Sequence, residues 1–109
     1  MAIMKPICKT YDNGNKEWRL NGKLHRIDGP AVEQARGIKY WYLHGKKHRT
    51  DGPAIELADG SKYWYVDDQL HRIDGPAVEY ACGDTSYWIN GVDYSFEEWD
   101  RLRKLLWIL

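Results

Sequence analysis

Apolar and polar residues alternate in short runs along most of the chain, and glycine punctuates the runs. Residues 54–58 and 61–66, for example, flank the pair Asp59-Gly60. Asp-Gly between two β-prone runs is a strong hairpin signal, because a type I′ turn needs positive φ at both central residues. The pattern therefore predicts short antiparallel strands over most of the sequence.

The pattern recurs with a period of 23 residues, without insertions. The block His-Arg-x-Asp-Gly-Pro-Ala begins at His25, again at His48 and again at His71. Such self-similarity is the signature of a repeat architecture. All ten glycines occupy one of three positions within the 23-residue unit, and each of these positions is expected to be a turn. No glycine is therefore left for a separate phosphate-binding loop.

Four such units in series predict an all-β repeat fold. We expect four consecutive antiparallel hairpins over residues 7–94, forming a meander or an elongated twisted sheet of about eight strands. The 109 residues are expected to make one domain, because this length is typical of a single core.

The turns also predict which residues share a face of the sheet. A two-residue turn at Asp59-Gly60 would pair Glu56 with Tyr63 and Ile55 with Trp64. The tryptophans and aliphatic residues then lie on one face, which varies little between units and is interpreted as the packed side. The other face is expected to carry Tyr40, Tyr42, Tyr63, Tyr65 and Trp88, with Glu33, Glu56 and Glu79 beside them.

The last part of the chain, residues 95–109, breaks the repeat. Ser95 followed three residues later by Glu98 is a capping-box signature, and apolar residues then recur at helical spacing. We expect a helix that caps the open end of the sheet, since terminal repeats need capping. The alternative is a homodimer contact through Trp99, Leu102, Leu106 and Leu109.

Charge and cysteine content narrow the function classes. The chain has 16 basic and 16 acidic residues, so no general basic field favours nucleic acid or an anionic membrane. No apolar run approaches the roughly 20 residues of a membrane helix, and residues 1–9 lack the apolar stretch of a secretory signal. Cys8 and Cys82 lack the spacing of a zinc site or a disulfide framework. We expect a cytoplasmic protein without a cofactor.

The repeated His-Arg-x-Asp block contains residue types that are common in catalytic and metal sites, but its spacing favours a structural role. Equivalent residues of two-strand units lie about 10 Å apart, whereas each ligand of one zinc ion lies about 2 Å from it. Catalytic sites are also rarely repeated three times along a chain, so no metal site and no enzyme is expected. The aspartates would accept backbone N–H bonds in their turns, the arginines would pair with carboxylates, and the histidines would pack flat against aromatic rings. The residues concerned are His25, Arg26, Asp28, His48, Arg49, Asp51, His71, Arg72 and Asp74.

The unit Tyr-Trp-Tyr-Leu-x-Gly-Lys-x-His-Arg-x-Asp-Gly-Pro-Ala resembles repeats in small proteins of tailed phages and giant viruses. It is similar to the MORN repeat, which is also a 23-residue hairpin unit, although Arg26, Arg49 and Arg72 stand where the usual MORN pattern has glycine. The resemblance covers residues 7–94. It implies a scaffold or interaction role, lipid binding in some arrays, and no catalytic residues.

The tyrosine-bearing face is the candidate functional surface. Tyrosine outnumbers phenylalanine 8 to 1, and its hydroxyl tolerates water, which favours partial exposure. We expect a non-enzymatic protein-binding module, a viral factor that binds and inhibits or redirects a host protein such as a defence component. One alternative is a nucleotide or sugar binder that combines aromatic stacking with Arg and His. A weaker alternative is a MORN-like scaffold or lipid-binding repeat.

Overall fold

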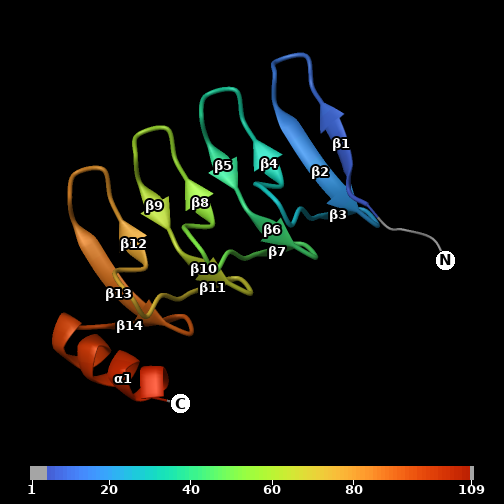
Figure 1. Ribbon diagram of the computed structural model, residues 1–109. Coiled ribbons are helices and arrows are strands. Elements are labelled where there is room, and N and C mark those ends of the chain that lie inside the picture. The colour runs from blue at the N-terminus through green and yellow to red at the C-terminus, as the bar shows by residue number, and fades with distance from the viewer. Residues whose placement is uncertain (1–4, 109) are drawn as a thin grey trace.

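A computed structural model describes residues 5–108 and shows a thin, single-layered sheet with a helix at its C-terminal end (Figure 1). The molecule measures 46 × 39 × 17 Å. The predicted all-β meander with one C-terminal helix is confirmed. The strands are β1 (Ile7–Thr10), β2 (Lys16–Leu20), β3 (Lys23–Leu24), β4 (Val32–Glu33), β5 (Lys39–Tyr40), β6 (Tyr42–Leu43), β7 (Lys46–Lys47), β8 (Ile55–Glu56), β9 (Lys62–Tyr63), β10 (Tyr65–Val66), β11 (Gln69–Leu70), β12 (Val78–Glu79), β13 (Thr85–Ile89) and β14 (Val92–Tyr94), and the helix is α1 (Phe96–Ile108).

The strands follow one another across the main sheet in the order β1-β2-β4-β5-β8-β9-β12-β13-β14, with β3 paired to β2. The pairs β6–β7 and β10–β11 form small ribbons beside it. Backbone bonds tie successive hairpins together, as from Trp41 N to Ala54 O and from Trp64 N to Ala77 O, both 2.7 Å. Each unit therefore contacts mainly its neighbours, as in other repeat arrays.

The register differs by one residue from the predicted one, because the long hairpins close over three residues instead of two. Leu57 N donates to Ser61 O at 2.9 Å and Gly60 N donates to Leu57 O at 3.1 Å, while Gly60 has a φ of 95°. This is a type I turn followed by a left-handed glycine, the common three-residue hairpin loop. The register consequently pairs Ile55 with Tyr63 and Glu56 with Lys62.

This shift redistributes residues between the two faces, since directly paired residues point to the same side. Glu33, Glu56 and Glu79 lie on the side of the tryptophans, opposite to the tyrosines, which corrects the prediction that tyrosine and glutamate share a face. We call one side the tyrosine face, with Val32, Tyr40, Tyr42, Ile55, Tyr63, Tyr65, Val78, Tyr80 and Trp88. We call the other the arginine face, with Trp18, Arg26, Glu33, Trp41, Arg49, Glu56, Trp64, Arg72 and Glu79.

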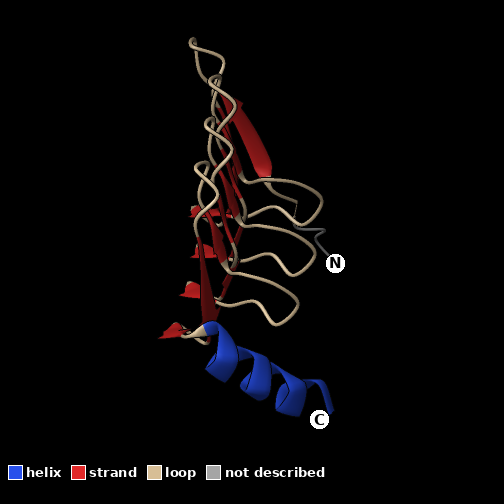
Figure 2. Ribbon diagram, turned by 90° about the vertical axis from the view of Figure 1, so that its left-hand side faces the viewer, coloured by secondary structure: helices blue, strands red, loops and turns tan. Residues whose placement is uncertain are grey.

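Type I′ turns do occur, but at the short loops that join β2 to β3 and its equivalents. Both central residues have positive φ at Asn21-Gly22, His44-Gly45 and Asn90-Gly91, and also at Asp67-Asp68. After the first three of these turns along the chain, the backbone forms a loop that contains the Asp-Gly-Pro block. Seen edge-on, three such loops project from one side of the layer (Figure 2).

The helix α1 caps the last unit as predicted. Ser95 Oγ accepts a hydrogen bond from Glu98 N at 3.2 Å, which satisfies one of the free donors at the helix start. Trp99 is only 3% exposed. Its ring centroid lies 4.6 Å from that of Tyr87, which occupies the tryptophan phase of the repeat.

Candidate functional site

The arginine face is ordered by three cation–π pairs that recur with the period of the repeat. Arg26 lies over Trp18 with its Cζ 3.8 Å from the ring centroid, and Arg49 lies over Trp41 at 3.9 Å. Arg72 lies over Trp64 at 3.7 Å. A sheet without a second layer needs another cover for its tryptophans, and the guanidinium groups supply it.

The glycine of the Asp-Gly-Pro block makes this stacking possible. A Cβ placed on Gly52 would lie 2.5 Å from Arg49 Cζ, and a Cβ on Gly29 or Gly75 would lie 2.7 Å from the Cζ of Arg26 or Arg72. Real Cβ atoms do not approach other atoms so closely. Each guanidinium is thus held between an indole ring and a glycine backbone.

Hydrogen bonds fix the orientation of each arginine within its own unit. Arg49 Nε donates to Asp51 Oδ1 at 3.0 Å and its Nη1 donates to Pro53 O at 3.0 Å, and the same bonds recur at Arg26 and Arg72. The predicted pairing of arginine with nearby carboxylates is confirmed. Asp28, Asp51 and Asp74 accept bonds from these arginines, not the backbone bonds that were predicted for them.

The histidines of the block join neighbouring units. His25 Nδ1 accepts a bond from His44 N at 2.9 Å, and His71 Nδ1 accepts one from Asn90 N at 3.0 Å. His48 Nδ1 lies 3.2 Å from Asp67 N, and here Asp67 Oδ1 lies at 3.2 Å as well. The prediction that these rings pack flat against aromatic residues is therefore wrong. Each imidazole instead clamps the tight turn of the following unit.

Burial affects two of these imidazoles. Desolvation lowers the pKa of His25 below its usual value, and the neighbouring His44 lowers it further. Burial alone lowers the pKa of His71. Both rings are thereby kept neutral, as acceptance of a backbone N–H by Nδ1 requires.

The tyrosine face brings together the aromatic residues that were predicted to form a patch. Tyr63 and Tyr80 meet edge to face with centroids 6.2 Å apart, and Lys47 Nζ lies 4.5 Å from the centroid of Tyr65. Burial raises the pKa of Tyr42, as do the nearby Tyr40, Asp68 and Tyr65. Tyr40, Tyr42, Tyr63, Tyr65 and Trp88 are each partly exposed.

The surface changes character along the array. At the positions of Tyr40 and Tyr42, the N-terminal unit has Glu17 and Arg19, which pair at 3.3 Å. In the last unit the same positions hold Ser86 and Trp88, joined by a bond from Trp88 Nε1 to Ser86 Oγ at 2.8 Å. The aromatic residues are therefore most numerous in the second, third and fourth units, and the first unit adds Tyr11, whose hydroxyl donates to Glu17 Oε2 at 3.1 Å.

The helix α1 leaves the tyrosine face open. Trp99 packs on Tyr87, and its Nε1 donates to Arg72 O at 2.8 Å, so α1 lies at the end of the array on the side of the arginine loops (Figure 2). Among residues 5–108, no element packs over the tyrosine face. Of the residues predicted for a homodimer contact, Trp99 is buried, Leu102 is half-buried, Leu106 is exposed, and Leu109 lies outside the described residues.

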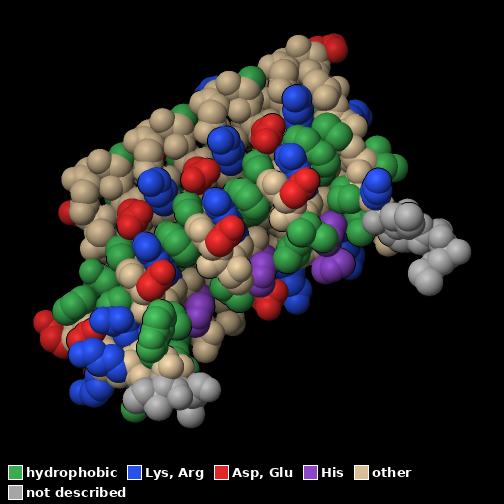
Figure 3. Space-filling model, viewed as in Figure 1, with side chains coloured by type: hydrophobic (Ala, Val, Ile, Leu, Met, Phe, Trp, Pro, Cys, Tyr) green, Lys and Arg blue, Asp and Glu red, His purple; other side chains and the backbone are tan. Residues whose placement is uncertain are grey.

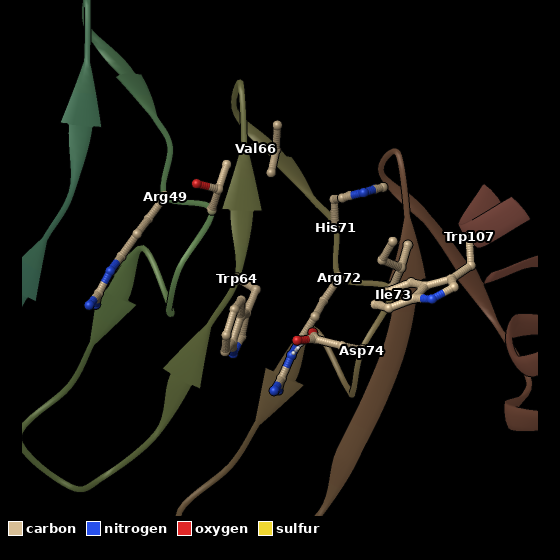
Figure 4. A pocket seen from close by; sticks show the side chains of 9 residues that line it. Arg49, Trp64, Val66, His71, Arg72, Ile73, Asp74 and Trp107 are labelled. Carbon is tan, nitrogen blue, oxygen red and sulfur yellow. Dashed lines mark hydrogen bonds and ion pairs between the residues drawn. The ribbon is translucent and has the colours of Figure 1, made fainter. Parts of the chain in front are cut away.

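The arginine face also carries two grooves that were not predicted from the sequence. Figure 3 shows this face, on which basic and acidic side chains lie next to one another among hydrophobic ones. The first groove, of about 280 Å³, lies between the loops of Arg26 and Arg49, and the second, of about 320 Å³, lies between those of Arg49 and Arg72. Residues 23 positions apart line equivalent places in both. Figure 4 shows the second groove, where Trp64 and Val66 lie between Arg49 and the segment from His71 to Asp74, with Trp107 beside it.

Within residues 5–108, no helix is long and apolar enough to cross a membrane, and no three His, Cys, Asp or Glu side chains are grouped as metal ligands. Comparison of the chain with protein-family models, with curated proteins and with solved structures finds no match in any of the three.

Proposed function

We propose that the protein is a non-enzymatic module that binds another protein, and that the tyrosine face is its contact surface. The observation that supports this most directly is the open position of Tyr40, Tyr42, Tyr63 and Tyr65 on a single-layered sheet. A layer 17 Å thick offers these rings no second sheet to pack against. Contiguous exposed aromatic residues commonly mark interaction sites.

The residue types suit a protein partner. Tyrosine combines a large apolar ring with a hydroxyl that can donate or accept a hydrogen bond, and Tyr and Trp are common anchors of protein interfaces. Lys47 and Asp68 lie at the edge of the cluster around Tyr65. This gives the apolar surface a polar rim, as in known interfaces.

The repeat can keep its fold while the residues of the tyrosine face differ from unit to unit. Backbone bonds, histidine clamps and arginine stacks repeat from unit to unit on the other side. On the tyrosine face, by contrast, one equivalent position of the four units holds Arg19, Tyr42, Tyr65 and Trp88 in turn. Constant internal bonding with varied outward residues is the arrangement that a recognition module needs.

The class of partner is drawn from the sequence resemblance to phage and giant-virus repeats. A viral module of this kind would bind a host protein, such as a defence component, in the host cytoplasm and inhibit or redirect it. The neutral overall charge favours an apolar contact over electrostatic capture of nucleic acid or anionic lipid.

A nucleotide or sugar binder is supported less well. Arg26, Arg49 and Arg72 are already stacked on tryptophans and bonded to aspartates, so their guanidinium groups are not free for a phosphate. A lipid-binding role would need a net positive face, and the chain carries equal numbers of acidic and basic residues.

The test is an affinity capture from host lysate that compares matched variants. Tyr42→Ala with Tyr65→Ala removes two rings from the tyrosine face, whereas Lys39→Ala with Lys62→Ala removes two exposed side chains from the arginine face. We expect a stoichiometric protein with the wild type and the lysine variant, and none with the tyrosine variant. Equal capture by all three would exclude the tyrosine face as the contact surface.

A further inference from the structure

The two grooves of the arginine face repeat with the period of the chain. Thr50 lies on the ridge between them and lines both. The first groove contains Trp41, Leu43 and His48, and the second contains Trp64, Val66 and His71 at the equivalent positions. A ligand that fills both grooves must present similar groups twice at the spacing of one repeat.

That spacing follows from the sheet. One unit adds two strands, and neighbouring strands lie about 4.8 Å apart, so equivalent places recur at about 9.6 Å. A polyproline II helix has three residues per turn and a rise of about 3.1 Å, so it repeats every 9.3 Å or so. Successive turns of such a helix can therefore place the same side of the ligand in successive grooves. An extended β-strand, with about 6.6 Å between residues on one side, does not match.

The second groove has a hydrogen-bond donor on His71. His71 Nδ1 accepts the bond from Asn90 N, so the ring proton is on Nε2, which leaves a donor at the second groove. At His48, Asp67 N and Asp67 Oδ1 both lie 3.2 Å from Nδ1. The indole N–H groups of Trp41 and Trp64 are buried and have no partner among residues 5–108. These two indole N–H groups are closed to solvent, so they are not among the donors that a ligand in the grooves can reach.

A proline-rich segment matches the donor on His71. In a polyproline II helix the carbonyl groups make no internal bonds, so they are available as acceptors, and proline has no N–H that would need one. Each arginine beside the grooves is bonded to an aspartate, and Arg26 and Arg72 also pair with Glu33 and Glu79, so the grooves carry no excess of positive charge. Charge thus favours an uncharged ligand over a phosphorylated or acidic peptide.

We propose that the arginine face binds a proline-rich segment of another protein in the polyproline II conformation. The segment lies across the loops and places an apolar residue from successive turns into the two grooves. Trp, Leu or Val lines each groove beneath it, and His71 donates from Nε2 to one of its carbonyl oxygens. This site is on the opposite side of the sheet from the tyrosine face, so it goes beyond the function proposed above and can fail independently of it.

The experiment uses a fluorescein-labelled peptide of four Pro-Pro-Leu triplets, with anisotropy as the readout on the full chain. A peptide of four Gly-Gly-Leu triplets is the control for the ligand, because it keeps the leucines but loses the rigid helix. Thr50→Arg fills both grooves from an exposed ridge position. Thr85→Arg is the matched protein control, because Thr85 is also exposed but lines neither groove.

We expect saturable binding of the proline peptide, weakened about tenfold or more by Thr50→Arg and unchanged by Thr85→Arg. Binding should also be unchanged by Tyr42→Ala with Tyr65→Ala, which separates this site from the tyrosine face. The proposal is overturned if the proline peptide does not saturate, if the glycine peptide binds equally well, or if Thr50→Arg has no effect. Circular dichroism of each variant verifies that the sheet is retained.

Discussion

The guanidinium of Arg49 lies 3.9 Å above the ring of Trp41, and this stack, repeated in the neighbouring units, takes the place of a second layer. The sheet contains few large buried side chains. Its most buried repeated positions are Ala31, Ala54 and Ala77, each with no exposed surface. Stability must therefore depend strongly on the arginine stacks and the histidine clamps.

The first prediction concerns the glycine that holds the stack. Gly52→Ala places a Cβ 2.5 Å from Arg49 Cζ, so the guanidinium must leave its position. We expect a loss of about 1–3 kcal/mol in the free energy of unfolding, as for other overpacked sites. Urea denaturation measures it.

A double-mutant cycle identifies the cause of that loss. In an Arg49→Ala background there is no guanidinium for the new Cβ to displace, so Gly52→Ala should then cost much less. Equal costs in both backgrounds would show that the loop backbone, and not the stack, requires glycine.

The second prediction concerns pH. The pKa values of His25 and His71 are lowered from 6.5 in the folded chain, so the unfolded chain takes up protons more readily below that pH. The contribution of these two groups to the free energy of unfolding should therefore be constant above about pH 6.5. Below that pH the free energy of unfolding should fall as the pH drops. Asp59 and Asp100 also have lowered pKa values, but their contribution is lost only near or below pH 3.8.

Urea titrations between pH 8 and pH 5 test this directly. His71→Ala removes one clamp, so the variant should be less stable at pH 8 and should lose less stability on acidification. A wild-type stability that is constant or rises from pH 7 to pH 5 would contradict the clamp.

The repeat, the hairpins, the capping box and the clustering of tyrosines could be predicted from the sequence, because each depends on residues close together in one unit. The register could not. Gly60 after Asp59 is compatible with a two-residue turn and with a three-residue loop, and the choice moves Glu56 to the other face. The partner of His71 was also inaccessible, because Asn90 belongs to the next unit and only the stacking of units brings them together.

The third prediction concerns the cap. Trp99 is 3% exposed and packs on Tyr87, whereas Trp107, eight residues later in α1, is 67% exposed. Trp99→Ala should cost about 3–5 kcal/mol, as other buried aromatic truncations do, and Trp107→Ala should cost little. Similar losses for the two variants would show that the helix is not held by Trp99.

The most direct test of the proposed contact surface is to measure folding and binding of Tyr42→Ala with Tyr65→Ala in the same preparation. Thermal unfolding should remain close to that of the wild type, whereas Trp41→Ala, which removes the ring beneath Arg49, should cost several kcal/mol. Binding of the captured partner, titrated by calorimetry, should be lost in the tyrosine variant. A tyrosine variant that fails to fold would show that this face is core, and one that folds and binds with wild-type affinity would show that the contact surface lies elsewhere.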